Sequence, residues 1–206
     1  MIFPIAAITV VLVFCVSFSV AAPGVGPTGA SLEDIKYAGS GCPTGATHLW
    51  HSGPDWANLT FALDDYLPTP APGAPPLSKR KNCNINAKIH VPPGYQYTLY
   101  EHSLIGNLYL SDKVKFTHQA DYWFAGLAGK KARFFLSSYG PQSSYNIADT
   151  LVDSALVWSP CGGVGDGWLN ISAQAYTDNS ANPAPWLKID VQDLIQMVYY
   201  LQWRKC

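Results

Sequence analysis

Short stretches of alternating apolar and polar residues recur along most of the chain. The clearest runs from Cys83 to Val91, where every second residue from Ile85 onward is apolar and the residues between are polar. A period of two is typical of a β-strand with one buried face. The same pattern, interrupted by turn residues, predicts strands over Ala46–Trp50, Leu59–Leu63, Tyr95–Leu104, Asn107–Leu110, Lys115–Ala125, Ala132–Leu136, Leu156–Ser159, Leu169–Tyr176 and Met197–Lys205.

Many short strands separated by turns predict an all-β protein, a single-domain antiparallel β-sandwich of the jelly-roll type. Only Ile189–Val198 is ambiguous, since its apolar residues also fit one face of a helix. The proline-rich stretch Pro68–Ser78 cannot enter the interior of a sheet and is predicted to be a surface loop. The glycine-rich stretch Gly162–Gly167 is expected to form a hairpin loop rather than a phosphate cradle, because the residues that follow it resemble a strand.

The N-terminal segment has the features of a secretory signal peptide. Its first 22 residues carry no charge, and small residues precede a predicted cut between Ala21 and Ala22. An uncleaved membrane anchor is the alternative, but the first basic residue is Lys36, so no basic stop-transfer cluster follows. We therefore expect a signal peptide (1–21), a flexible lead-in (22–38) and a secreted domain (39–206), with no stable membrane insertion after cleavage.

Four cysteines remain after removal of the leader, an even number that suits an oxidising compartment. Counting strand directions, under the assumption of local hairpins, predicts disulfides between Cys42 and Cys83 and between Cys161 and Cys206. Greek-key crossings would change that pairing. No closely spaced cysteine pair of the kind that binds zinc is present, so we expect neither a metal nor another cofactor.

Charge and composition narrow the set of partners. The chain has 13 basic and 14 acidic residues and no basic stripe, so nucleic acid is not expected as a partner. Charged residues make up 13% of the chain and aromatic residues another 13%. This balance favours a folded extracellular β-protein whose surface is polar through Ser, Thr, Asn and Gln, and it argues against disorder.

Four cysteine-centred motifs carry a family resemblance. In order they are Gly41-Cys42-Pro, Arg80-Lys-Asn-Cys83, Val157-Trp-Ser-Pro-Cys161-Gly162 and Leu201-Gln-Trp-Arg-Lys-Cys206. From about Gly39 to Cys206 the chain resembles the fungal secreted family catalogued as domain of unknown function 4360. The resemblance implies a small exported protein, most often fungal, and it supplies no catalytic residues.

Candidate catalytic residues are few. His48 and His51 stand at an odd spacing, which points them to opposite faces of a strand and argues against a metal pair. Asp64-Asp65 could supply a carboxylate for glycoside hydrolysis, with Glu101 or Asp121 as its partner. Adjacent strand residues point apart, so this doublet cannot itself be the pair. The catalytic residues of any activity therefore stay unknown at this level.

The tryptophans suggest carbohydrate binding, because an exposed aromatic face can stack on a sugar ring. Five of them lie near turns or strand ends and are candidate ligand-stacking residues: Trp50, Trp56, Trp123, Trp168 and Trp186. Packing in the core or at its rim is the alternative for these five, and it is the role we expect for Trp158 and Trp203.

Two kinds of covalent processing are predicted. Asn58 and Asn170 begin the only two Asn-x-Ser/Thr sequences, so both are expected to be glycosylated, with Leu59 and Ile171 facing the core. The basic pair Lys79-Arg80 follows the proline loop and is a candidate cleavage site, although a solvated basic pair is the commoner explanation.

Three functional hypotheses follow from these observations. We favour a non-enzymatic secreted protein of the cell surface, cell wall or host interface that binds glycan or protein through its loops. The alternatives are a carbohydrate-active enzyme whose carboxylates meet only in the fold, and a structural component of the cell wall. All three place the protein outside the cell, either extracellular or in the cell wall.

Overall fold

The computed structural model describes residues 25–45, 49–53, 55–68, 79–106, 108–141, 145–163, 167–181, 187–189 and 195–206. The predicted signal peptide and most of the proline-rich loop lie outside these ranges. The strands are β1 Ser31–Ala38, β2 Leu49–Ser52, β3 Asn58–Leu63, β4 Arg80–His90, β5 Tyr95–Gly106, β6 Leu108–Leu110, β7 Lys115–Phe124, β8 Ala132–Tyr139, β9 Tyr145–Thr150, β10 Trp168–Asp178, β11 Leu187–Ile189 and β12 Ile195–Lys205.

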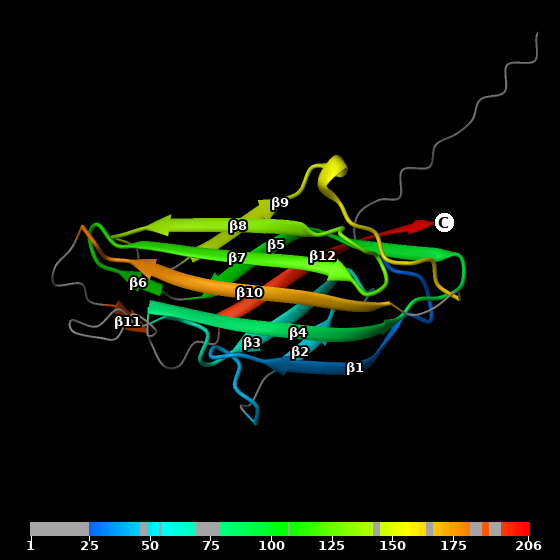
Figure 1. The fold of residues 1–206 in the computed structure, drawn as a ribbon, viewed down its shortest axis with the longest axis horizontal. Helices are drawn as coiled ribbons and strands as arrows, with labels where there is room; N and C mark the ends of the chain where they lie inside the picture. The colour runs from blue at the N-terminus through cyan, green and yellow to red at the C-terminus, as the bar shows by residue number, and fades with distance from the viewer. Residues whose placement is uncertain are drawn as a thin grey trace, which may run out of the picture.

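Two five-stranded antiparallel sheets form the predicted β-sandwich (Figure 1). Sheet A has the order β1-β4-β10-β7-β8, and sheet B has the order β2-β3-β12-β5-β9. Strands β6 and β11 pair separately at one end. The one helix among these elements is a short 3-10 turn, Asp153–Ala155, and no helix in the described ranges is long and apolar enough to cross a membrane.

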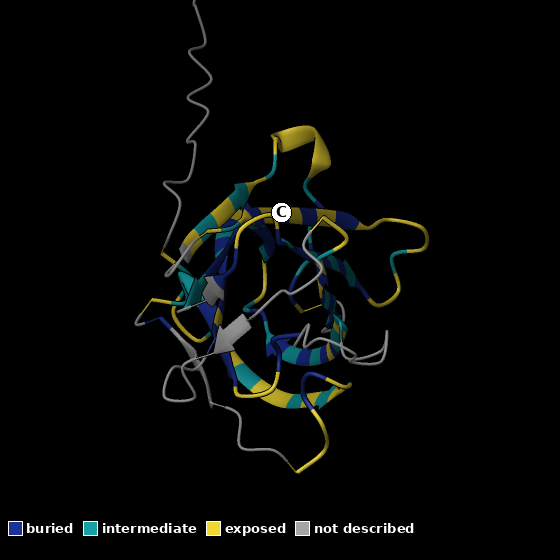
Figure 2. Ribbon diagram, turned by 90° about the vertical axis from the view of Figure 1, so that its left-hand side faces the viewer, coloured by how far each residue is buried: buried dark blue, intermediate teal, exposed yellow. Residues whose placement is uncertain are grey.

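The core lies between the two sheets, and strands such as β4 and β8 turn every second residue into it (Figure 2). On β4 the inward residues Cys83, Ile85, Ala87 and Ile89 are all buried, as the alternation predicts. Burying one large apolar side chain of this kind contributes about 1.5–3 kcal/mol. This alternation also fixes the opposite face of β4, which carries the polar residues and points to solvent.

The lead-in predicted to be flexible over 22–38 contains strand β1, which pairs antiparallel with β4 along the edge of sheet A. Its apolar residues Leu32, Ile35 and Tyr37 pack against the core. A register shift between Leu32 and Asp34 breaks the period of two, so the strand does not show the alternation by which others are recognised. The folded domain therefore begins before Gly39.

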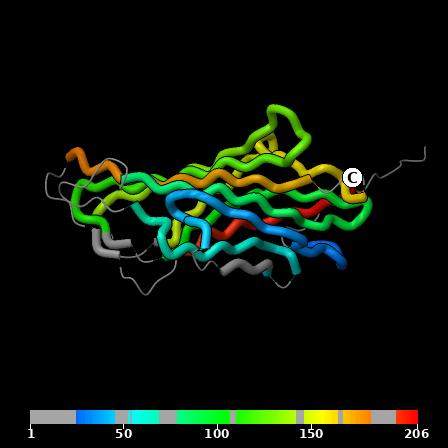
Figure 3. The backbone as a smooth tube through the Cα atoms, turned by 60° about the horizontal axis from the view of Figure 1, so that its bottom comes forward, coloured from blue at the N-terminus to red at the C-terminus, as the bar shows by residue number. Residues whose placement is uncertain are grey.

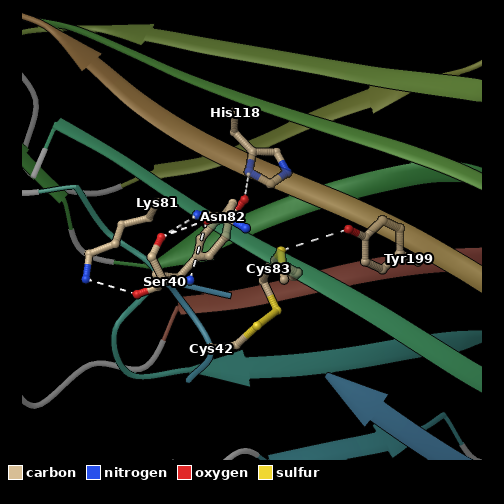
Figure 4. Close-up of a disulfide and its surroundings, with 9 residues drawn as sticks. Ser40, Cys42, Lys81, Asn82, Cys83, His118 and Tyr199 are labelled. Carbon is tan, nitrogen blue, oxygen red and sulfur yellow. Dashed lines mark hydrogen bonds between the residues drawn. A yellow bond between two sulfur atoms is a disulfide. The ribbon is translucent and has the colours of Figure 1, made fainter. Parts of the chain in front are cut away.

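The Cys42–Cys83 disulfide closes the end of the β1–β4 ladder, with a Cα–Cα distance of 5.4 Å (Figure 4). Just before it, Ser40 Oγ donates to Asn82 Oδ1 and Gly41 N–H donates to the Asn82 carbonyl. A Cβ atom at Gly39 would lie 2.2 Å from that carbonyl oxygen, so only glycine fits there. The predicted bond is present, but the strand that brings its cysteines together is β1 rather than the local hairpin assumed from sequence.

The Cys161–Cys206 disulfide is also present, with a Cα–Cα distance of 6.0 Å. It closes over the start of β5: Cys206 N–H donates to the Gly94 carbonyl, and Gly162 N–H donates to the Tyr95 carbonyl. The C-terminal strand β12 is longer than predicted and runs between β3 and β5 (Figure 3). The C-terminal end of the described domain is thus covalently tied to the loop before β10, and the segment after β1 is tied to β4.

The segment Leu156–Ser159 is extended but is not the predicted strand. It lies beside β5, where Ser159 N–H donates to the Tyr97 carbonyl. The Tyr122 hydroxyl enters the space between them: it donates to the Leu99 carbonyl at 2.8 Å and accepts from Val157 N–H at 3.2 Å. A side chain therefore replaces the ladder bonds, and β9 forms the regular edge of sheet B instead.

Candidate functional site

The outward face of sheet A is unusually rich in side-chain amides. Strand β4 presents Asn82, Asn84 and Asn86 at successive outward positions, because the residues between them face the core. Strand β10 places a polar residue directly opposite each one, and β7 continues the surface with Gln119 opposite Gln174. We call this surface the amide face and define it by Asn82, Asn84, Asn86, Asn170, Ser172, Gln174 and Gln119.

The amides of this face differ in how many hydrogen bonds they already make within the protein. Asn86 Nδ2 donates to Asn170 Oδ1 at 2.5 Å, across the β4–β10 pair. Asn82 is occupied by the Ser40 contact beside the disulfide. Asn84 is exposed and makes no side-chain hydrogen bond within the described part of the chain. The centre of the face can therefore donate to and accept from a ligand.

Two of the predicted stacking residues border one end of the amide face. Trp123 on β7 pairs with Asn170, and Trp168 on β10 is two residues before it, so both rings lie on the same side of the sheet. Both tryptophans are half-buried. Lys131 Nζ lies 4.3 Å from the Trp123 ring centroid, and Lys36 Nζ lies 5.1 Å from that of Trp168. These cation–π contacts hold the rings in place.

A shallow depression lies at the opposite end of the same surface. Its volume is about 540 Å³, and it is lined by Lys79, Arg80, Gln119, Gln174, Tyr176 and Thr177. Lys79 Nζ donates to Asn179 Oδ1 at 2.8 Å, and Arg80 Nη2 donates to Gln174 Oε1. Tyr176, 37% exposed, stands opposite Arg80 in the strand register. The depression is therefore basic and rich in hydrogen-bond donors.

The other candidate tryptophans are not brought to this surface. Trp56 lies in the turn before β3, half-buried against the core, and its carbonyl accepts from Trp203 Nε1 at 2.9 Å. Trp50 belongs to β2, but the structure does not describe its side chain. Trp186 lies outside the described residues. Trp203 is buried, as predicted, and Trp158 stacks under Arg204.

The carboxylates considered for glycoside hydrolysis are dispersed. Asp121 is on the outward side of β7, where Arg133 binds both of its oxygens at 2.7 and 3.0 Å. Glu101 belongs to β5 in the other sheet, and Asp64 and Asp65 are exposed after β3. Among the described residues, the fold therefore does not bring Asp121 and Glu101 to one surface. His48 lies outside the described residues, and the His51 side chain is not described.

Two buried histidines form a cluster that the sequence patterns do not reveal. His102 from sheet B and His118 from sheet A are fully buried, and their Nε2 atoms are 2.9 Å apart. His118 Nδ1 is 3.1 Å from the Tyr66 hydroxyl, and the ring centroids of Tyr199 and His102 are stacked 4.2 Å apart. Burial lowers the pKa of His102 to about 3 and that of His118 well below its ordinary value. Because no substrate can reach it, we assign this cluster to the core.

The predicted modification sites lie in different settings. Asn58 begins β3 and Asn170 belongs to the amide face; both are half-buried, while Leu59 and Ile171 point into the core as expected. Arg80 is the first residue of β4 and pairs with Tyr176 on β10. Cleavage after Lys79-Arg80 would therefore cut the chain at the start of a strand that is paired there with β10 on one side, and it stays a prediction.

Comparison with known proteins decides the family. The model of a domain of unknown function, DUF4360, matches residues 28–206, which is most of the chain. The chain belongs to the DUF4360 family. An uncharacterized secreted protein of Arthroderma benhamiae is 27% identical over 183 residues, covering 87% of this chain and 73% of the relative. That relative and the two disulfides agree with export, so this DUF4360 protein is secreted.

Among solved structures, TmCBM61 in complex with β-1,4-galactotriose matches this DUF4360 domain at 8% identity, over 84% of this chain and 88% of that one. The TM-score is 0.27, which is too low for any inference about a shared ligand. What this DUF4360 domain binds has to be argued from its own residues.

Proposed function

We propose that this secreted protein is a non-enzymatic glycan-binding protein and that the amide face is its contact surface. One observation carries the proposal: the outward positions Asn82, Asn84 and Asn86 of β4 stand in register with Gln174, Ser172 and Asn170 of β10. This differs from the loop-based binding expected from the sequence, because a rigid sheet rather than a loop positions the polar groups.

The cost of this arrangement supports a functional role. Asparagine is depleted in β-strands, where β-branched and aromatic residues fit the pleated surface better. Three outward asparagines therefore make β4 less stable than Thr or Val at the same positions would. Residues that break a local structural rule without an evident structural gain are expected at functional sites. Asn84, exposed and unbonded within the described part, is the clearest such residue.

The chemistry of the surface suits sugars. Each amide offers two donors and one acceptor oxygen, which complements hydroxyl groups that both donate and accept. Trp123 and Trp168 add aromatic rings at one end of the face, and Tyr176 adds another at the opposite end. A protein interface is supported less, since the centre of such an interface is normally apolar and this face is polar.

The two alternatives receive less support. Glycoside hydrolysis needs two carboxylates facing one another across the scissile bond. Of the carboxylates considered, Asp121 is neutralised by Arg133 and Glu101 belongs to the other sheet. A purely structural wall protein would not need an exposed amide such as that of Asn84, which is unbonded within the described residues.

Binding to a glycan array and to insoluble cell-wall polysaccharide tests the proposal. The informative variant is Asn84→Thr/Asn86→Thr, which removes two amides but improves strand propensity. It should retain or raise the melting temperature and lose at least about tenfold in affinity, the equivalent of roughly 1.4 kcal/mol. The matched control is Gln196→Thr, an exposed amide on β12 of the other sheet, which should bind normally. Equal binding by both variants would overturn the proposal.

A further inference from the structure

Some of the cations near the amide face are paired with carboxylates. Lys88 Nζ lies 2.6 Å from Glu33 Oε2, and Arg133 Nε lies 2.7 Å from Asp121 Oδ1. Lys79 and Arg80 are different: within the described part of the chain, the hydrogen-bond acceptors of both are neutral amide oxygens. Among the described residues, two positive charges therefore stand in one depression without a carboxylate in ion-pair contact.

The depression holds more hydrogen-bond donors than its own acceptors use. An arginine carries five N–H groups and a lysine three, and the contacts described here use one of each. Gln174 accepts from Arg80 through Oε1, so its amide N–H groups are not used in that contact. A surplus of donors beside positive charge is complementary to an anion, which has acceptor oxygens only.

One carboxylate lies close by, but it is engaged elsewhere. Asp178 Oδ1 accepts from Ser180 N–H at 2.9 Å. That backbone hydrogen bond is the main reason that the pKa of Asp178 is lowered, with smaller contributions from the positive charges of Lys115 and Lys79. Asp121 accepts from Gln119 of the depression at 3.4 Å, but Arg133 offsets its charge. Against Asp178 stand Lys79, Arg80 and Lys115, so the local balance of the described residues is positive.

We infer that the Lys79–Arg80 depression binds the anionic group of an acidic polysaccharide, either a sugar carboxylate or a phosphate ester. The guanidinium of Arg80 presents a planar fork that matches either oxyanion, and Lys79 adds a second charge. Tyr176 lies opposite Arg80 and offers a partly exposed ring beside the sugar that carries the anion. The inference rests on the proposed function, since the neutral part of the same polymer would lie along the amide face.

The test compares polymers that differ only in charge. Polygalacturonate is matched with its fully methyl-esterified form, and phosphomannan with the same mannan after dephosphorylation. The secreted protein, its Arg80→Gln variant and a Lys130→Gln control are titrated with each polymer. Lys130 is an exposed lysine in the turn before β8, so its replacement removes the same charge away from the depression.

The expected result is that one acidic polymer binds at least about tenfold more tightly than its neutral match, and that added salt weakens it. Arg80→Gln should remove that preference, while Lys130→Gln keeps it. Preference for polygalacturonate identifies a carboxylate, and preference for phosphomannan identifies a phosphate ester. Equal binding of charged and neutral polymers that still depends on Asn84 and Asn86 would overturn this inference and leave the proposed function standing. Absence of binding to every polymer and to the glycan array would overturn both.

Discussion

His102 Nε2 and His118 Nε2 meet 2.9 Å apart in the core and link the two sheets by one hydrogen bond. The direction of that bond follows from its neighbours. The Val198 carbonyl can only accept, so His102 Nδ1 carries a proton and its Nε2 accepts from His118. His118 Nδ1 then accepts from the Tyr66 hydroxyl. The chain of three bonds is complete only when both imidazoles are neutral.

This arrangement predicts that stability falls on mild acidification. Both folded-state pKa values lie below the unfolded value of about 6.5, with His102 at about 3. The stabilisation is therefore complete above about pH 6.5 and is lost as the pH falls toward the folded-state values, by up to about 1.4 kcal/mol per pH unit for each histidine. Denaturant unfolding at pH 7.5, 6.5 and 5.5 measures this loss.

A variant separates the pair from other titrating groups. In His102→Leu/His118→Leu, the free energy of unfolding should change much less between pH 7.5 and 5.5, whatever its absolute value. Carboxylates with lowered pKa values, such as Glu33 and Asp178, act below this range. The same pH dependence in wild type and variant would rule out the assignment.

Two buried tyrosines should respond oppositely to loss of their hydroxyl groups. The Tyr97 hydroxyl has no hydrogen-bond partner within the described residues, whereas that of Tyr122 bonds Thr98, Leu99 and Val157. An unsatisfied buried hydroxyl costs about 1–3 kcal/mol. Tyr97→Phe should therefore keep or raise the melting temperature, and Tyr122→Phe should lower it. Thermal unfolding of both variants checks this, and a clear loss in Tyr97→Phe would contradict it.

Removing the C-terminal disulfide should destabilise the fold and reduce secretion. Cys161 and Cys206 are 45 residues apart, and a loop of that size contributes about 4 kcal/mol in the chain-entropy model. Net stability is typically about 5–15 kcal/mol, so Cys161→Ser/Cys206→Ser should melt roughly 10 °C lower. Cys42→Ser/Cys83→Ser should lose more, because it also buries two hydroxyls at fully enclosed positions. Unchanged melting in the first variant would contradict the account.

Glycosylation at Asn58 and Asn170 stays a prediction. Treatment of the secreted protein with a glycosidase should lower its mass. The Asn58→Gln and Asn170→Gln variants should each lose less mass than the wild type, because each lacks one glycan. Asn170 belongs to the amide face and bonds Asn86, so a glycan there would cover the end of the face that holds Asn86 and Trp168. Tyr176 is six residues further along β10, about 20 Å away, so the basic depression would stay open. An unchanged mass after treatment would exclude both sites.

Local alternation is enough to predict most of the strands, and β4 is the best example. Strand β1 is not predicted from the sequence, because its register shift breaks the period of two and because it follows a Gly/Pro-containing stretch. The strand predicted over Leu156–Ser159 is wrong for the opposite reason. Its sequence suits a strand, but Val157 N–H donates to the Tyr122 hydroxyl instead of to a neighbouring strand. In both cases a contact distant in sequence decides the local structure.

The candidate site depends even more on distant contacts. Asn84 and Ser172 become neighbours only through the β4–β10 pairing, across 88 residues of chain. The three asparagines of β4 are visible in the sequence, and their low strand propensity is the signal that could have singled them out. The histidine pair had no such signal. His118 occupies an ordinary inward position of β7, and His102 faces inward only because a register shift beside Tyr100 moves the alternation of β5 by one residue.

The most direct test of the central claim is a glycan titration followed through the side-chain NH₂ signals of the asparagines and glutamines by NMR. Addition of a glycan that the protein retains should shift the signals of Asn84, Asn86 and Gln174 together and leave that of Gln196, on the other sheet, in place. Shifts confined to Gln196 and its neighbours, or binding with no shift on the amide face, would contradict the account.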